Sequence, residues 1–341
     1  MADLHGRNDR DPLWQGISIA TLLAKHAVSL RQHRRNLGAC ERRLTEIVAG
    51  GTGRLAGPAR ETLAAGGKRL RPLLVFCSAP LGHGRSGALV STAAAVELVH
   101  MATLVHDDLL DGAKLRRGHP TIATTHGADR AVQVGDYLFA QAFAELAVNA
   151  PPEAVRVLAG AALDLSEGEI DQQRAAFDLN LSEADYLSRC RRKTSSLFSA
   201  AARLGAMIGG AGAETQERLA IFGERVGIAF QIFDDILDVA GTPSRTGKRR
   251  GTDLLGGTIT LPVIYALQRE PELAHLIATA GNGTGVEALC DRLAEHPAIG
   301  AARERALGFV AEARAALDAP LDGVDAEVLL KLADGVVDRY S

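Results

Sequence analysis

Apolar residues recur along most of this chain at the three- and four-residue spacing of helices, and no β-hairpin signature appears. Glycine and proline clusters separate the apolar stretches, as is typical of breaks between helices. The segment Ser182-Glu183-Ala184-Asp185 has the character of a capping box, so a helix is expected to start there. The pattern predicts one all-α domain with long helices over about 17–48, 88–111, 152–177, 183–207 and 214–239, and a helical stretch up to Asn149 that Gly127 and Gly135 interrupt.

The stretch from Ala88 to about Asp111 is apolar on nearly all sides, which indicates a helix buried in the centre of the fold. The first residues of the chain are polar and charged, and residues 1–15 are predicted to form a disordered tail. No low-complexity linker divides the remainder, so residues 16–341 are expected to form a single domain.

Composition supports this picture and excludes several classes of protein. Of the 341 residues, 47% are apolar and only 4% aromatic, a balance that favours helices over sheets. The net charge of −3 indicates neither nucleic acid nor an acidic membrane surface as a partner. The four cysteines show no C-x-x-C spacing, which argues against a structural zinc site and fits reduced thiols in the cytoplasm. There is neither a signal-peptide core nor a charge-free apolar run of about 18 residues, so no transmembrane segment is expected.

Two acidic motifs of the form Asp-Asp-x-x-Asp lie in apolar stretches far apart along the chain. The first contains Asp107, Asp108 and Asp111, and the second contains Asp234, Asp235 and Asp238. Each motif directs its carboxylates toward one face of a helix, because steps of three and four residues return to the same side. Clustered carboxylates in apolar surroundings repel one another and are costly to desolvate, so they require a counter-charge. Oxygen ligands of this kind favour Mg²⁺ over Zn²⁺, which indicates a magnesium-bound anion.

Four groups of basic residues accompany the acidic motifs. Each group alone would be a solvated surface, but two of them closely follow an acidic motif along the chain. Carboxylates and basic side chains in one site are neutralised together when Mg²⁺ bridges the carboxylates to phosphate oxygens and Arg or Lys binds the rest. The candidate polyphosphate contacts are Gly66 to Pro72, with Lys68 and Arg71; Arg116-Arg117; Arg192-Lys193-Thr194; and Gly247 to Gly251, with Lys248.

Three uncharged side chains are further candidates for the site. His100 lies two helical turns before the first motif on the same face, where a place in the core and a hydrogen bond to phosphate are equally favoured. Gln231 lies one turn before the second motif, so its amide can face the same cavity. Thr194 is a candidate only because of its basic neighbours. His106 points away from the first motif and is expected to be structural.

Taken in order, these segments resemble the trans-isoprenyl diphosphate synthases from about residue 60 to residue 265. The resemblance includes Glu97-x-x-His100 before the first acidic motif and Gly247-Lys248-x-x-Gly251-x-Asp253-Leu254 after the second. It implies an isoprenoid-synthase-type helical bundle around a central cavity, usually assembled as a homodimer. It also implies Mg²⁺-dependent, head-to-tail condensation of isopentenyl diphosphate with an allylic diphosphate to give a polyprenyl diphosphate.

The resemblance implies roles for individual residues as well. Three Mg²⁺ ions would clamp the allylic diphosphate, held by Asp107, Asp108, Asp111, Asp234 and Asp238, with Asp235 the least favoured ligand. The clamp would be completed by Arg116, Lys193 and Lys248. The oxygens of Thr194 and Gln231 would face the allylic cation. Isopentenyl diphosphate would be held by Lys68, Arg71, His100 and Arg117.

The chain departs from the family at Thr258, in Gly257-Thr258-Ile259-Thr260-Leu261-Pro262, where many members have Lys. Threonine cannot supply that positive charge, so one diphosphate contact is expected to be missing. Glu169 and Gln172 resemble a polar pair of the family and are expected at most to support the ligands.

Product length is expected to depend on the helix that carries the first motif. The growing chain would descend along this helix, where each turn advances about 5.4 Å. Short-chain members carry an aromatic ring at the fourth or fifth position before the motif, whereas this chain has Thr103 and Ala102 there, with Val99 and Leu98 one turn deeper. The expected product is C30 to C50, with geranylgeranyl diphosphate (C20) as the alternative. A ring from another helix, such as Phe139 or Phe143, could still close the tunnel.

Three other functions compete with this one. A class I terpene cyclase would share the first motif and Mg²⁺, but it would not need Lys68, Arg71 and Arg117 for isopentenyl diphosphate. A non-catalytic subunit of a heteromeric synthase would carry degraded acidic motifs, and both motifs are intact here. A helical scaffold with metal-stabilised ends would not require the ordered set of motifs.

Overall fold

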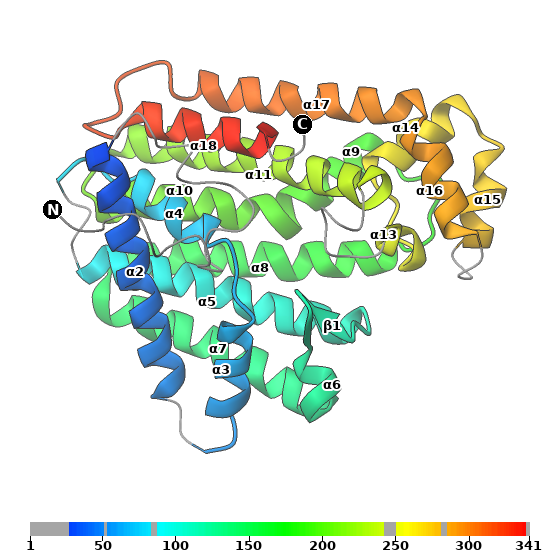
Figure 1. The fold of residues 1–341 in the computed structure, drawn as a ribbon. Coiled ribbons are helices and arrows are strands. Elements are labelled where there is room, and N and C mark those ends of the chain that lie inside the picture. Colours follow the sequence, from blue (N-terminus) through cyan, green and yellow to red (C-terminus); the bar gives the residue numbers. More distant parts are fainter. Residues whose placement is uncertain (1–26, 51–52, 83–86, 242–249, 281–284, 339–341) are drawn as a thin grey trace, which may run out of the picture.

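Long helices lie side by side across the molecule and form its body (Figure 1). The computed structural model describes residues 27–50, 53–82, 87–241, 250–280 and 285–338. The long helices are α5 (Gly87–Leu110), α7 (Ala128–Asn149), α8 (Pro152–Arg174), α10 (Ser196–Ile208), α11 (Ala213–Ala240) and α17 (Pro297–Ala315). The all-α fold expected from the apolar spacing is therefore confirmed.

Further elements cover the body and its ends. α2 (Ala27–Ala49) runs steeply across the long helices and packs on α5 (Figure 1). The remaining elements are α3 (Ala56–Ala64), α4 (Leu70–Cys77), β1 (Leu115–Arg116), β2 (His119–Pro120), α6 (Ile122–His126), α9 (Glu183–Cys190), η2 (Arg191–Ser195), α13 (Thr252–Leu255), α14 (Leu261–Arg269), α15 (Leu273–Ala280), α16 (Val286–Ala294) and α18 (Ala326–Asp338).

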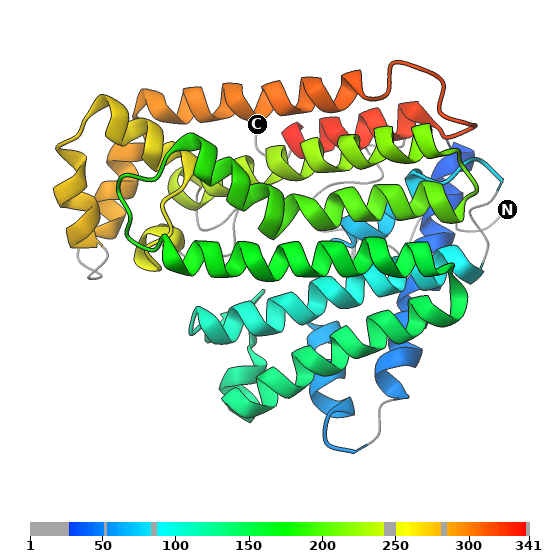
Figure 2. The ribbon, with the colours of Figure 1, turned by 180° about the vertical axis from the view of Figure 1, so that it is seen from behind.

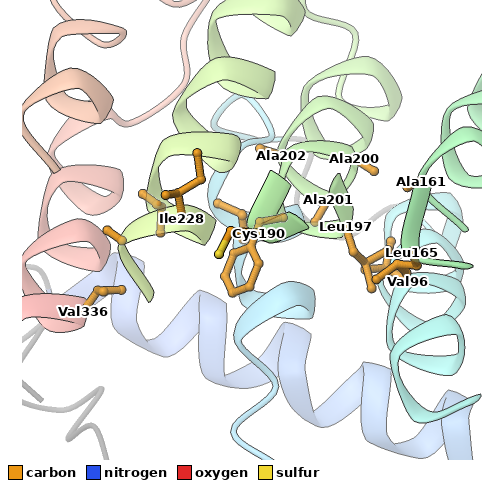
Figure 3. Close-up of a cluster of buried hydrophobic side chains, with 14 of the residues drawn as sticks. Val96, Ala161, Leu165, Cys190, Leu197, Ala200, Ala201, Ala202, Ile228 and Val336 are labelled. Carbon is orange, nitrogen blue, oxygen red and sulfur yellow. The ribbon is translucent and has the colours of Figure 1, made fainter. Parts of the chain in front are cut away.

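α5 is the central helix of the core, as its all-apolar sequence predicts. Its neighbours include α2, α4, α7 and α10. The helix is long and apolar enough to cross a membrane, but 72% of its apolar window is buried inside the protein, as in the core helix of a folded domain. Figure 3 shows part of this core, with buried side chains from α5 (Val96), α8 (Leu165), α10 (Leu197) and α11 (Ile228).

The helical segment predicted from Ser182 to about Met207 is confirmed, with one change. The Ser182 hydroxyl accepts a hydrogen bond from the backbone N–H of Asp185 (3.1 Å), so the capping residue starts α9 as expected. α9, η2 and α10 then follow without interruption. Residues 191–195 widen into a π-helical turn, a rare feature that helical periodicity does not predict and that is frequent at functional sites.

The prediction that Gly135 interrupts a helix is wrong, because α7 runs through this residue. A Cβ atom at Gly135 would lie 2.0 Å from Nε2 of His106 on α5. That ring nitrogen is 3.2 Å from the carbonyl oxygen of Val132 on α7. The glycine therefore lets the two helices pack closely around His106, whose structural role was expected.

The expectation of no β-hairpin is wrong at one place. β1 and β2 pair antiparallel, and the two residues between them, Arg117 and Gly118, have φ of 53° and 80°. Positive φ at both central residues is what a tight hairpin turn needs. Arginine seldom adopts this conformation, which is why the sequence carried little signal for the turn.

Other boundaries shift slightly. The helix predicted over 17–48 is found as α2, and its residues 17–26 lie outside the described residues, as does the predicted tail over 1–15. The segment 241–257, predicted as loop, contains the short helix α13, and its residues 242–249 lie outside the described residues.

η2 is wedged between two helices at positions where each has a glycine. A Cβ atom on Gly168 of α8 would lie 2.6 Å from the backbone nitrogen of Lys193. A Cβ atom on Gly227 of α11 would lie 2.8 Å from Cα of Ser195. Both distances are shorter than carbon atoms tolerate, so glycine at these positions is what allows the wide π-turn to fit between α8 and α11.

We predict that Gly168→Ala lowers the free energy of unfolding by about 1–3 kcal/mol, because the added methyl group has to displace the η2 backbone. Gly160→Ala, on the same helix with nothing within 4 Å of the added Cβ, is the control and should be neutral or stabilising. Urea unfolding of both variants measures the difference. Equal effects would show that η2 is not packed tightly against α8.

Candidate functional site

The two acidic motifs lie at the same end of the helical body. α5 and α11 both run toward the side of the molecule that carries β1 and α13 (Figure 1). Seen from behind, α8 lies between α5 and α10 (Figure 2). η2, which packs on both α8 and α11, connects the surroundings of the two motifs.

The first motif is matched to two cations. Nε of Arg116 donates a hydrogen bond to Oδ1 of the buried Asp108 (2.6 Å). The Lys193 ammonium forms an ion pair with Glu169 and lies close enough to Asp107 and Asp111 to interact with them electrostatically. These carboxylates outweigh the effect of burial and raise the pKa of Lys193, so it stays charged.

The negative charge of Asp107 is only partly compensated by the cations around it. Burial raises the pKa of Asp107 to about 7, and Glu169 and Asp111 add to the rise while Lys193 and Arg116 oppose it. Burial makes the ionised form of this carboxylate unfavourable, so a further cation nearby would stabilise that form. This is the behaviour expected of a ligand to a divalent ion.

In the second motif, Asp235 is held by hydrogen bonds from two neutral side chains. The buried Asp235 accepts one bond from the Tyr186 hydroxyl (2.6 Å) and one from the Gln231 amide (2.7 Å). The Gln231 oxygen in turn accepts a bond from the Thr194 hydroxyl (2.7 Å). Burial raises the pKa of Asp235 to about 7, and both hydrogen bonds oppose that rise. Asp234, the adjacent candidate ligand, is half-buried.

The carboxylate of Asp238 binds backbone at the end of the second motif. Its two oxygens accept hydrogen bonds from the N–H groups of Thr252 (3.2 Å) and Asp253 (3.1 Å). Asp238 thus holds the start of α13, and an ion at this carboxylate would share oxygens that already accept bonds. Its role as a ligand stays a prediction.

A basic cavity lies beside the first motif. The hairpin contributes Arg116 and Arg117, and α5 contributes His100. Burial and the charges of Arg71, Arg117, Arg116 and Arg69 lower the pKa of His100 well below its ordinary value, so the imidazole is neutral. The charged and polar residues that line the cavity include Arg69, Glu97, His100, Asp108, Arg116 and Arg117. The lining contains three arginines and, with Glu61, three carboxylates, so an anion would be bound there by individual guanidinium groups such as that of Arg117 and not by a net positive charge.

Arg69 is a residue of this region whose role the sequence did not predict. It is buried, with φ of 50°, and its guanidinium binds Glu97 of α5 (2.8 Å) and Glu41 of α2. Two carboxylates compensate this charge, so Arg69 fixes the loop that carries Lys68 and the start of α4, which carries Arg71, instead of being available to an anion. The only sequence signal was the position of Glu97 one turn before His100.

Other predicted residues are placed as follows. Arg71 lies 4.5 Å over the Phe198 ring, and burial lowers the pKa of Arg71 to about 10. Lys68 is half-buried in the same loop. Glu169, expected at most to support the ligands, binds Lys193 directly. Lys248 lies outside the described residues, so its role stays a prediction.

Within the described ranges, no three His, Cys, Asp or Glu side chains are arranged to hold a metal ion by themselves. This finding fits Mg²⁺ in one specific way. Mg²⁺ is commonly held by one or two carboxylates together with substrate phosphates and water, rather than by a closed set of protein ligands. The all-oxygen donors of the two motifs meet that requirement.

Comparison with known proteins agrees with the geometry. The family model for polyprenyl synthetase matches residues 53–295. The chain is 43% identical over 251 residues to heptaprenyl diphosphate synthase component 2 of Geobacillus stearothermophilus, covering 74% of this chain and 78% of that protein. It is 38% identical over 282 residues to nonaprenyl diphosphate synthase of Mycobacterium tuberculosis, covering 81% and 84%.

Solved structures show the same fold. A polyprenyl synthase from Caulobacter crescentus, complexed with calcium and isoprenyl diphosphate, superposes with a TM-score of 0.84 at 34% identity, covering 96% of this chain and 99% of that one. A decaprenyl diphosphate synthase from Rhodobacter capsulatus superposes with a TM-score of 0.81 at 35% identity, covering 95% and 98%.

Proposed function

Since the chain belongs to the polyprenyl synthetase family, whose members are prenyltransferases, we propose that it condenses isopentenyl diphosphate head to tail with an allylic diphosphate. The product we propose is a medium- or long-chain all-trans polyprenyl diphosphate, in agreement with the hepta-, nona- and decaprenyl synthases that it resembles. The observation that carries the proposal is that Asp108 of the first acidic motif and its partner Arg116 both line the basic cavity. Two diphosphates, one bound through metal and one through arginine, would therefore lie side by side.

The allylic diphosphate would bind at the acidic motifs. Mg²⁺ held by these residues would supply the positive charge that lets pyrophosphate leave. The proposed ligands and cationic contacts on the protein are Asp107, Asp108, Asp111, Asp234, Asp238, Arg116, Lys193 and Lys248. Lys193 supports this assignment, because it is held at the first motif by Glu169 and keeps its proton.

Isopentenyl diphosphate would bind in the basic cavity. We assign its contacts to Lys68, Arg71, His100 and Arg117, three of them cationic and one a neutral imidazole that can donate a hydrogen bond to phosphate. Arg117 is positioned by the hairpin turn and by its bond to the backbone oxygen of Gly66. Such positioning converts a bimolecular alkylation into an effectively intramolecular step.

The allylic cation would form next to oxygen atoms. Thr194 and Gln231 supply side-chain oxygens that stabilise positive charge without reacting with it. We assign the final proton abstraction to the released pyrophosphate, which lies beside the new bond, so no separate protein base is required. Exclusion of water protects the cation from hydrolysis.

We further propose a cytoplasmic homodimer. α7 exposes a short stripe of small apolar side chains at four-residue spacing, formed by Ala140, Ala144 and Val148. A stripe of this kind allows the close approach of a second helix. The four cysteines are all buried and free, which agrees with a reducing compartment.

The pure chain, given Mg²⁺, labelled isopentenyl diphosphate and allylic primers, should form products of C30 to C50 without a partner subunit. Asp107→Ala should lower kcat by about 10³-fold or more with the fold intact, because uncompensated pyrophosphate cannot leave. Chromatographic sizing of the labelled products and circular dichroism of the variant are the measurements. Full turnover in EDTA, or release of a cyclic hydrocarbon, would contradict the assignment.

Thr103 is the better position at which to test product length. It shares the face of α5 with His100 and Asp107, and it is half-buried, whereas Ala102, Val99 and Leu98 are completely buried. We predict that Thr103→Phe shortens the main product to C15 or C20 while primer consumption continues, because the ring blocks descent along α5. Ala102→Phe should shorten it too, at a greater cost in stability.

Thr103→Val is the matched control for the ring, since it preserves the shape of threonine and should leave product length unchanged. Radio-chromatography of the three proteins under one set of substrate ratios gives the comparison. An unchanged distribution with Thr103→Phe would place the elongating chain along another helix.

A further inference from the structure

A chain of hydrogen bonds connects three elements behind the second acidic motif. Tyr186 of α9 contacts Asp235 of α11, Asp235 contacts Gln231 one turn earlier, and Gln231 contacts Thr194 of η2. The distances between the bonded atoms are 2.6, 2.7 and 2.7 Å, all within the range of well-formed hydrogen bonds. Tyr186 is completely buried, and Asp235 and Thr194 are nearly so.

The direction of every bond in this chain is set at Asp235. Its two carboxylate oxygens accept one hydrogen bond from the Tyr186 hydroxyl and one from the Gln231 amide nitrogen. Once the Gln231 amide nitrogen faces Asp235, the amide oxygen faces Thr194. Thr194 then has to donate its single proton to that oxygen, which leaves the lone pairs of its own hydroxyl oxygen for other neighbours.

The same contacts leave Asp235 poorly suited to bind metal. Each of its two oxygens already accepts a short bond from a neutral donor, and the residue is 3% exposed. Asp234, one position earlier, is half-buried and has the exposure that a ligand to a substrate-bound ion requires. The two adjacent aspartates therefore have different environments, and different roles follow.

Tyr186 is itself held firmly. The guanidinium of Arg189 lies 5.5 Å from the centroid of its ring and donates a hydrogen bond to the carbonyl oxygen of Ile259 (2.6 Å). Arg189 thus connects α9 to the segment before α14, and the phenol is positioned from both sides. Tyr186 lies one helical turn before Cys190, which lies about one turn before Thr194. This spacing places Tyr186 and Thr194 on the same side of the helical segment.

We propose that Tyr186 and Asp235 are positioning residues that fix the proton orientation of Gln231 and Thr194, and that Asp235 is not a magnesium ligand. The inference rests on the proposed function, in which the Thr194 oxygen faces an allylic cation. A hydroxyl group that presents lone pairs stabilises that cation, whereas one that presents its proton repels it. The pair acts on the reaction through Thr194 without touching substrate.

The test uses Tyr186→Phe and Asp235→Asn, which keep the volume of each side chain and change only its hydrogen bonds. We expect kcat to fall about 10-fold in Tyr186→Phe and about 100-fold in Asp235→Asn, since Asn can donate to Gln231 and reverse its amide. The KM for isopentenyl diphosphate and the Mg²⁺ concentration at half-maximal rate should stay within about twofold of wild type. Asp234→Asn should instead raise the Mg²⁺ requirement.

Tyr265→Phe is the matched control. The Tyr265 hydroxyl also donates to a carboxylate, that of the half-buried Glu183 of α9 (2.9 Å), but this bond is not part of the chain that leads to Thr194. Its loss should leave kcat unchanged. Thermal unfolding of each variant shows that the compared proteins are equally folded.

A double-mutant cycle separates positioning from general stabilisation. In a Thr194→Val background no hydroxyl proton remains to be oriented, so Tyr186→Phe should then change kcat by less than about twofold. Losses that multiply in the cycle would overturn the inference. So would a Mg²⁺ requirement that Asp235→Asn raises as much as Asp234→Asn does. In either case, prenyl transfer by the wild-type protein would still support the proposed function. A wild-type protein without prenyl transfer would overturn both.

Discussion

Negative charge confined to a partly buried space has to be compensated, and the arrangement of the charged residues in this protein follows from that requirement. Asp108 is paired with Arg116, Glu169 with Lys193, and Glu97 with Arg69. Asp107 is compensated only in part, and its pKa rises to about 7 because of burial and neighbouring carboxylates. In the proposed reaction, a divalent ion shared with a diphosphate would supply the missing charge.

The acidic and the basic parts of the site lie next to each other in the fold. Arg116 belongs to both, since it binds Asp108 and lines the basic cavity around His100. η2 serves a comparable purpose between the motifs, because successive residues of its π-turn reach different partners: Lys193 interacts with the first motif, and Thr194 bonds to Gln231 beside the second. Gly168 and Gly227 leave room for that turn.

Much of this arrangement could be predicted from the sequence. Helical spacing identified the central helix α5 and the capped start of α9, because burial and capping leave local signals. The acidic and basic motifs were recognisable because like charges are rarely clustered in apolar helices. The π-turn and the contact of Gly135 with His106 could not be predicted, since each depends on packing between elements distant in sequence. The hairpin at Arg117 could not be predicted because arginine seldom adopts a positive φ. Tyr186 and Arg69 were missed for the same reason: their partners lie on other helices.

The central claim is that magnesium is held jointly by the protein and a substrate diphosphate. Calorimetric titration of Mg²⁺ into the protein, alone and with an unreactive allylic thiolodiphosphate, tests it most directly. We predict that Mg²⁺ binds weakly to the protein alone and at least about tenfold more tightly in the presence of the analogue. Mg²⁺ should strengthen binding of the analogue by the same factor. Tight, stoichiometric binding of Mg²⁺ to the protein alone, unchanged by the analogue, would contradict it.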